Sequence, residues 1–189
     1  MSIILASASP RRAELLQQIG LEFEVSPSDI DESAHSNEAV EDYVQRMAWS
    51  KALVARQQYL PQDIIIAADT TVAIDNTILG KPQDEAHCLE MLASLSDRIH
   101  KVYTAVVVSQ LDFVGKALST SEVSFRKINA AEAKNYWLTG EPKDKAGSYA
   151  IQGKGAVFVN NISGSYSGVV GLPLYELTQL LRDTDVSIL

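Results

Sequence analysis

The pattern of hydrophobic and polar positions along the chain predicts a fold of mixed strands and helices. The segment from Asp63 to Val72 holds an uninterrupted apolar run, which is typical of a central strand covered on both faces. From about Asn37 to Tyr59 the apolar residues instead recur every 3.6 residues, as on one face of a helix. The other predicted elements are strands at 3–6, 23–25, 98–109, 113–127 and 156–159, and helices at 10–20, 84–95, 129–140 and from 172 onward.

Two of these strands define the type of sheet. Segments 98–109 and 113–127 are rich in Val and Thr and are separated by a short polar break, which predicts an antiparallel pair and therefore a mixed sheet. A chain of 189 residues can bury a core as one domain or as two lobes that share a cleft. We expect a single α/β domain over residues 1–189.

Composition narrows the classes of partner. The net charge of −8 disfavours broad binding to nucleic acid or anionic lipid, so an anionic substrate would need a local cluster of cations. No apolar run is long enough to span a bilayer, and the N-terminus lacks the basic region of a signal peptide. We therefore expect a cytoplasmic protein. The single Cys88 excludes an internal disulfide and a zinc site built from several cysteines.

The first candidate site is the turn between the first strand and the first helix, Ser7 to Arg12. Ser9 is a favoured N-cap residue and Pro10 suits the first helical position. Arg11 and Arg12 then lie in the first turn, beside unpaired N–H groups and the positive end of the helix dipole. Such a place favours an anion, so we interpret the turn as a phosphate-binding cradle. The alternative is that both arginines are simply solvated.

The second candidate site follows the central apolar run. Asp69 and Thr70 come directly after that run, and ligands of α/β proteins gather beyond the carboxyl ends of central strands. A buried carboxylate is costly unless it has a partner, so Asp69 is a candidate metal ligand or base. The alternative is a buried aspartate that caps neighbouring backbone groups.

The helix from about 37 to 59 carries one cation on its apolar face. Lys51 must either extend along its stem to solvent or point its ammonium group into a polar cleft, and we favour the cleft. Trp49 and Leu53 lie on the opposite side of this helix. Their position suggests a second covered surface, which we interpret as a possible homodimer contact.

The sequence lacks the usual phosphate-binding and hydrolase motifs. It has no P-loop, no dinucleotide-binding glycine pattern after a strand, no serine-hydrolase elbow and no zinc-binding H-E-x-x-H pattern. What remains suits Mg²⁺- or Mn²⁺-assisted chemistry on a phosphate ester, because oxygen ligands hold a hard cation while basic side chains bind phosphate oxygens. The candidate carboxylates are Glu32 and Asp69, and the candidate cations are Arg11, Arg12, Lys51 and Lys81.

Five motifs occur in order along nearly the whole chain: Ser7-x-Ser9-Pro10-Arg11-Arg12, Ala68-Asp69-Thr70, Gly80-Lys81-Pro82, Asp144-Lys145-Ala146-Gly147-x-Tyr149-x-Ile151-Gln152-Gly153 and Gly164-Ser165-Tyr166-x-x-Val169-x-Gly171-Leu172-Pro173. Together they resemble the motifs of the Maf family of nucleoside triphosphate pyrophosphatases. The resemblance implies an elongated α/β fold related to inosine triphosphate pyrophosphatases, with a mixed twisted sheet flanked by helices and two lobes around a central cleft. It also implies metal-dependent cleavage between the α- and β-phosphates.

The same resemblance implies roles for particular residues. The combination of Asp69 and Thr70 with Gln152 resembles the subgroup that acts on dTTP and UTP, in which modified pyrimidine nucleotides are further possible substrates. Asp69 matches the family's proposed proton acceptor, and Arg11, Thr70 and Gln152 match positions associated with substrate choice. Residues matched more weakly, or as part of the first motif, are Glu32, Lys51, Lys81, Ser7, Ser9 and Arg12, which we expect to contact metal or substrate.

The implied mechanism places Mg²⁺ or Mn²⁺ on Asp69 and Glu32, with Asp69 activating a water that attacks the α-phosphorus. The cations would offset charge on the leaving pyrophosphate. Gln152 can match the O4 and N3–H edge of thymine or uracil, provided that its amide is held in one orientation. The expected role is removal of unwanted nucleotides from the pool. The alternative is a nucleotide-binding regulator of septum formation that does not turn over.

Overall fold

The protein is described by a computed structural model that covers residues 1–186 and 188. Within these residues, seven strands form one mixed sheet in the order β2-β1-β3-β5-β6-β7, with β4 paired to β3. β1 runs parallel to β2 and β3, and the other pairings are antiparallel. The mixed sheet and the antiparallel pair of β5 and β6 confirm the prediction. The strands are β1 (Ile3–Leu5), β2 (Glu24–Val25), β3 (Ile64–Ile74), β4 (Thr77–Leu79), β5 (Ile99–Gln110), β6 (Phe113–Phe125) and β7 (Val159–Ser163).

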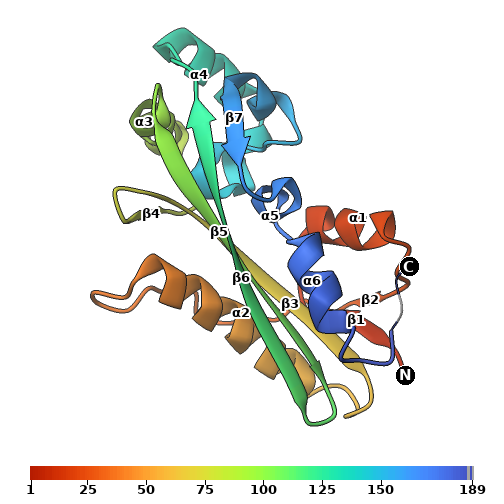
Figure 1. Cartoon of the computed structure of the whole chain (residues 1–189). Helices are drawn as coiled ribbons and strands as arrows, with labels where there is room; N and C mark the ends of the chain where they lie inside the picture. The colour runs from red at the N-terminus through yellow and green to blue at the C-terminus, as the bar shows by residue number, and fades with distance from the viewer. Residues whose placement is uncertain (187, 189) are drawn as a thin grey trace.

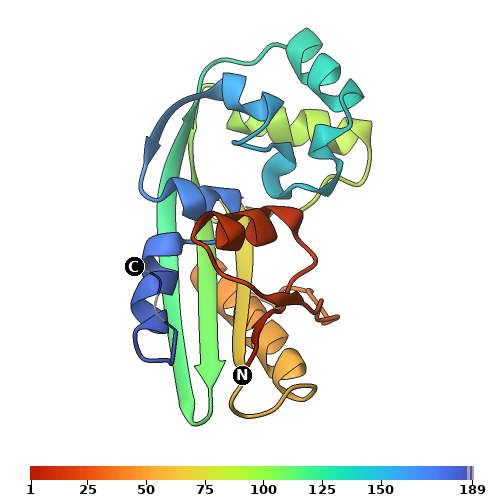
Figure 2. The ribbon, with the colours of Figure 1, turned by 90° about the vertical axis from the view of Figure 1, so that its right-hand side faces the viewer.

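The helices divide between the two ends of this long sheet. In Figure 1, α2 covers one face of the lower part, α1 and α6 lie on the other side, and α3 and α4 stand at the upper end. Figure 2 shows the same elongated, two-lobed shape from the side. The helices are α1 (Pro10–Gln18), α2 (Val40–Arg56), α3 (Glu85–Leu95), α4 (Ala130–Leu138), α5 (Tyr166–Val170) and α6 (Leu174–Leu181), and the 3₁₀ turns are η1 (Glu141–Asp144), η2 (Ala146–Ser148) and η3 (Lys154–Phe158).

The central strand β3 is buried on both faces because each face packs against a different layer. Successive side chains of a strand point to opposite faces. Ile65 and Ala67 pack against α2, whereas Ile66 and Ala68 pack with α1 and α6 in a separate cluster. All four are fully buried. The continuous apolar run of β3 therefore reflects a strand that is covered on both faces, as the sequence predicts.

A polar row divides one face of the sheet into a lower and an upper core. Thr70 of β3 lies opposite Thr104 of β5, which lies opposite Ser119 of β6. Below this row, Ala68 belongs to the cluster under α1 and α6, and above it Val72 belongs to the cluster under α3 and α4. The apolar cover of the sheet is interrupted at this row, which makes the molecule two-lobed.

Local sequence signals explain where several helices begin and end. Pro10 occupies the first position of α1, as predicted. Asn129 caps α4 in a reciprocal capping box with Glu132. Gly20 follows α1 and Gly140 follows α4, and both have a φ of +77°. This left-handed backbone conformation, which glycine adopts readily, ends each helix. These residues fix both ends of the first and fourth helices within a residue or two of the predicted bounds.

Two predicted details are wrong. The strand predicted at 156–159 is instead the 3₁₀ turn η3 followed by β7, because the irregular backbone there buries Phe158 in the upper core and leaves Val157 exposed. Asp69 does not follow the end of its strand, since β3 remains paired with β5 as far as Ala73. Ser9 stands at the N-cap position of α1, as predicted, although its hydroxyl makes no capping bond to any residue that the structure describes.

The surface proposed for dimer contact is only partly apolar. Trp49 is half-buried against the cluster under α2, and the Lys116 ammonium lies 3.9 Å from the centre of its ring. Leu53 is 44% exposed. The homodimer stays a prediction. Along residues 1–186 and 188, the structure contains no helix whose length and apolar character would let it cross a membrane.

Candidate active site

A cleft of about 590 Å³ opens between the lobes at the level of the polar row. Its walls come from α1 and the preceding turn, the loop before α2, β3, the turn after β4, and the segment from η1 to Gln152. The structure brings together in this cleft every site residue that the sequence predicts. These residues are Ser7, Ser9, Arg11, Arg12, Glu32, Lys51, Asp69, Thr70, Lys81 and Gln152.

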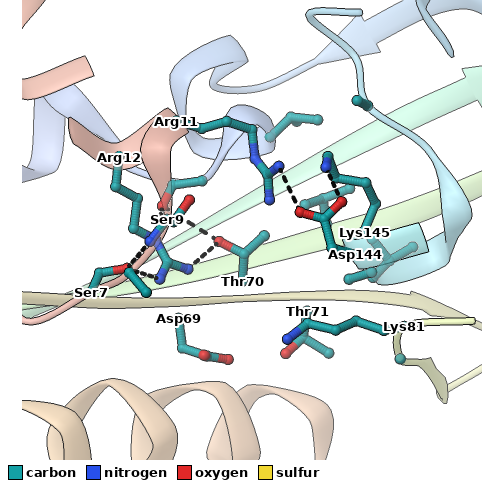
Figure 3. Close-up of a pocket in the computed structure, with 18 of the residues that line it drawn as sticks. Ser7, Ser9, Arg11, Arg12, Asp69, Thr70, Thr71, Lys81, Asp144 and Lys145 are labelled. Atoms are coloured by element: carbon teal, nitrogen blue, oxygen red, sulfur yellow. Dashed lines mark hydrogen bonds and ion pairs between the residues drawn. The ribbon is translucent and has the colours of Figure 1, made fainter. Parts of the chain in front are cut away.

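Arg12 is held in place by bonds to three segments of the chain (Figure 3). Its Nε donates to the carbonyl oxygen of Gly171 at 2.8 Å, and its Nη1 donates to Ser7 Oγ at 2.9 Å. Its Nη2 donates to Thr70 Oγ1 at 3.3 Å. Burial lowers the pKa of Arg12 from its ordinary value, while the charge of Asp69 acts in the opposite direction. Arg12 is therefore a fixed group of the cleft wall, and the alternative of a solvated side chain is wrong.

Arg11 faces the opposite lobe. Its Nη1 lies 3.9 Å from Asp144 Oδ2, and Asp144 also pairs with the neighbouring Lys145. The hydrogen bond from Lys145 is the main reason that the pKa of Asp144 is lowered. Both residues line the cleft beside Arg11, as Figure 3 shows. The motif that contains them was noted in the sequence, but no side-chain role was assigned to either.

Lys51 joins the two carboxylates of the site. Its Nζ lies 2.7 Å from Asp69 Oδ1 and 2.7 Å from Glu32 Oε1. Asp69 is only 9% exposed and points from β3 toward α2, whereas the next residue, Thr70, points toward Arg12. The alternation of a strand thus directs one side chain to each wall. The prediction that Lys51 points into a polar cleft is confirmed.

Glu32 reaches this cluster from the loop before α2. The Tyr43 hydroxyl donates to the backbone carbonyl of Glu32 at 2.9 Å and holds the loop against the helix. Burial alone would raise the pKa of Glu32, but the hydrogen bond and charge of Lys51, with the charges of Lys81 and Arg12, lower it. The Glu32 carboxylate is therefore kept ionised beside Asp69.

The two carboxylates supply oxygen ligands of the type that a hard divalent cation prefers. Their oxygens already converge on one cationic atom, the Lys51 ammonium nitrogen. Within the part of the chain that the structure describes, no group of three or more His, Cys, Asp or Glu side chains is arranged to hold a metal. Two carboxylates alone would leave most positions of a six-coordinate ion to phosphate oxygens and water.

Lys81 and Gln152 lie on the wall of the cleft that the upper lobe forms. The Gly80–Lys81 turn is tied to η2 because the Gly147 amide donates to the Gly80 carbonyl at 3.1 Å. Lys81 is exposed and reaches into the cleft near Thr71 (Figure 3). Gln152 is also exposed and lines the cleft from an irregular turn between η2 and η3. Both side chains are accessible to a ligand.

Thr104 is a supporting residue that the sequence did not indicate. Its hydroxyl lies 3.0 Å from Thr70 Oγ1 and 2.7 Å from the carbonyl oxygen of Gly168. It therefore links the Thr70 hydroxyl, which is bound to Arg12, with the segment that precedes α6. A threonine in a Val-rich strand is ordinary, so no sequence signal would have selected it.

Comparison with known proteins shows the family of this chain. Residues 2–184 match the family described as Maf-like protein. The chain belongs to the Maf family. A relative from Methylobacillus flagellatus named dTTP/UTP pyrophosphatase is 50% identical over 98% of this chain and 94% of its own length. A relative from Haemophilus ducreyi named nucleoside triphosphate pyrophosphatase is 44% identical over 99% of this chain and 97% of its own.

Solved structures show a weaker likeness to this Maf-family chain. The Ham1 protein of Staphylococcus aureus is 17% identical, with a TM-score of 0.48 over 66% of this chain and 72% of its own. That score is too low for us to draw any conclusion from it.

Proposed function

We propose that this Maf-family protein hydrolyses dTTP and UTP to the nucleoside monophosphate and pyrophosphate. The observation that supports this proposal is the meeting of arginines, lysines and paired carboxylates from separate segments in one cleft of about 590 Å³. A triphosphate carries several negative charges and a base, and the two walls of the cleft suit these two parts. The name of the relative from Methylobacillus flagellatus supports the choice of dTTP and UTP.

The phosphate groups would lie against the cations of both lobes. Arg12 is already oriented by its bonds to Ser7 and Gly171, so binding a phosphate oxygen costs little further ordering of its side chain. Arg11 and Lys81 approach from opposite walls of the cleft. Donors fixed in advance can stabilise the charge that grows on the leaving pyrophosphate, a term that contributes about 3 kcal/mol per donor in well-studied enzymes.

Asp69 and Glu32 would hold Mg²⁺ or Mn²⁺ together with oxygens of the substrate. The ion would supply Lewis-acid stabilisation of the phosphate charge. Lys51 binds Oδ1 of Asp69, so Oδ2 is the oxygen that would accept a proton from water. In this arrangement Asp69 is the general base, and Lys51, which is also paired with Glu32, fixes its orientation.

Gln152 would contact the base. Its amide offers one acceptor and two donors, which match the N3–H and O4 of thymine or uracil. Thr70 lies in the same cleft but its hydroxyl is within bonding distance of Arg12 and Thr104, so we assign it a supporting place beneath the substrate. Removal of unwanted nucleotides, a cytoplasmic location and a homodimer form part of the same proposal.

The test is a panel of nucleoside triphosphates incubated with the purified protein and Mg²⁺ or Mn²⁺. We expect equimolar monophosphate and pyrophosphate, fastest from dTTP and UTP, and loss of turnover when the cation is chelated. In H₂¹⁸O the label should enter the monophosphate, because water attacks the α-phosphorus. Release of orthophosphate, or binding without turnover as a regulator would show, would contradict the proposal.

A further inference from the structure

The carboxylate of Glu141 lies in the upper lobe and organises the turn that carries Gln152. Its Oε2 accepts from the Lys154 amide at 2.9 Å, and its Oε1 accepts from the Gly155 amide at 3.0 Å. The Tyr136 hydroxyl also donates to Oε1, at 2.6 Å. One carboxylate thus binds the far end of the turn Ala150–Gly155 and a tyrosine of α4.

Tyr136 extends this link to the near end of the turn. Its side chain is 4% exposed, and its hydroxyl accepts from the Ala150 amide at 3.1 Å while donating to Glu141. Burial and the bond to Glu141 raise the pKa of Tyr136, so the hydroxyl keeps its proton at neutral pH. Burial alone would raise the pKa of Glu141, but the bonds from Tyr136, Lys154 and Gly155 lower it. Both groups are in the protonation states that these bonds need.

The glycines of the turn leave room for this pair. A Cβ atom at Gly153 would collide with the Glu141 carboxylate. A Cβ atom at Gly155 would lie 2.7 Å from the Tyr136 hydroxyl and 2.8 Å from the Ala150 carbonyl oxygen. The backbone of the turn therefore wraps closely around the buried Tyr136 and the half-buried Glu141, neither of which lines the cleft.

We propose that Glu141 and Tyr136 are positioning residues for base selection, which act by fixing the turn that presents Gln152 to the cleft. This inference rests on the proposed function. Gln152 lies between the two ends of the turn that these bonds hold, and its own side chain is exposed. The direction in which its amide points therefore depends on the backbone of the turn. Discrimination of thymine from cytosine needs an amide with a defined orientation, since the two bases present reversed donor and acceptor patterns.

The Glu141→Gln variant tests the proposal with little change in shape. An amide has one oxygen, so at least one of the N–H or O–H groups that now faces the carboxylate would face an NH₂ group. We expect KM for dTTP to rise by about tenfold with kcat within about threefold, because base binding is shared by ground state and transition state. The ratio of kcat/KM for dTTP to that for dCTP should fall by about tenfold.

Glu132→Gln is the matched control. Glu132 is in the same lobe, accepts from the Asn129 amide and pairs with Arg126, but it does not touch the turn. It should lower thermal stability while leaving the dTTP-to-dCTP ratio unchanged. If Glu141→Gln also leaves this ratio unchanged in a protein whose wild type is active, the positioning role is wrong.

Amide hydrogen exchange gives a readout that does not depend on activity. Glu141→Gln should speed exchange at Lys154 or Gly155, whereas Tyr136→Phe should speed it mainly at Ala150. Unchanged exchange at all these amides in both folded variants would overturn the inference. A wild type that releases no pyrophosphate would instead overturn the proposed function, so the two failures are distinguishable.

Discussion

The two walls of the cleft are built in different ways. On the phosphate-facing wall, most side chains come from α1, α2 and β3, whose backbone geometry is fixed by regular hydrogen bonds, and the loop before α2 adds Glu32. On the base-facing wall, Gln152 stands on an irregular turn between 3₁₀ helices. That turn is fixed by side chains, Glu141 and Tyr136, which bond to its amides.

This difference separates catalysis from selectivity. Every nucleoside triphosphate has the same phosphates, so a wall set by strand and helix geometry serves all of them. The base differs from one substrate to another, and a turn held by a few side-chain bonds can change its shape without disturbing β3. We therefore expect substitutions on the phosphate-facing wall to slow all substrates alike, and substitutions behind the Gln152 turn to change their ranking.

The largest expected effect comes from Asp69→Asn, which alters the phosphate-facing wall alone. Loss of the general base should reduce kcat about 10²–10⁴-fold for every accepted triphosphate, with the dTTP-to-dCTP ratio unchanged. The fold should persist, because Asn retains an oxygen for Lys51. Steady-state pyrophosphate release and the melting temperature check both points.

Asp75→Asn is the control for this substitution, since Asp75 is exposed in the turn after β3 and pairs with Arg98. It should retain normal turnover. Full activity in Asp69→Asn would contradict the assignment of Asp69 as the general base. It would also contradict the different roles assigned to the two walls of the cleft.

The next effect concerns the core behind the base-facing wall. His100 is 1% exposed, its Nε2 lies 2.8 Å from the Tyr149 hydroxyl, and burial lowers its pKa to about 4 from 6.5. Between these values the unfolded chain binds a proton that the folded protein does not, so stability is retained above pH 6.5 and falls as pH drops toward 4. The loss should reach up to about 3 kcal/mol.

His100→Phe should remove this pH dependence. It costs stability at pH 7 because the Tyr149 hydroxyl loses its partner, but the difference from wild type should shrink or reverse by pH 4. Urea unfolding at pH 7, 5.5 and 4 measures this, with His35→Gln as an exposed control. Parallel pH profiles for wild type and His100→Phe would contradict the assignment.

A smaller effect is expected from Arg12→Lys, at the junction of the two lobes. An ammonium cannot reproduce the fork that binds Gly171, Ser7 and Thr70 at once. KM should rise about tenfold for all triphosphates, equal to about 1.4 kcal/mol of lost binding, without a change in base ranking. Arg98→Lys, on an exposed pair, is the control. A changed ranking would show that Arg12 also acts on the base.

The smallest effect concerns the loop that supplies Glu32 to the phosphate-facing wall. Arg46 binds Glu38 through two bonds of 2.6 Å and also donates to the Ser33 carbonyl. The hydrogen bond from Arg46 is the main reason that the pKa of Glu38 falls from 4.5 to about 2. The loop should therefore stay attached above pH 4.5 and loosen as pH falls toward 2.

Carboxyl NMR titration measures the pKa of Glu38 directly. In Arg46→Gln the pKa should return toward 4.5, and KM for dTTP should rise only slightly at pH 7, because Tyr43 still holds Glu32. A Glu38 that titrates near 4.5 in the wild type would mean that the pair with Arg46 does not form in solution.

The sequence by itself determined the elements with strong local signals. The unbroken apolar run of β3, the helical period of α2 and the capping residues of α4 each predict their structure because the deciding interactions lie within a few residues. The motifs also identified residues that line one cleft, including Arg12, Asp69 and Gln152. The 3₁₀ turn at 154–158 was missed because Glu141 and Tyr136, distant in sequence, decide its backbone.

Only the tertiary structure decided how the cleft residues meet. The alternation of β3 turns Asp69 to Lys51 and Thr70 to Arg12, and the paired strands place Thr104 and Ser119 in one row with Thr70. The cleft lies at the level of that row, where Thr70 lines it and α5 covers Thr104. Such pairings depend on strand register and on which helix covers which face, and these are set by packing between segments far apart in the chain.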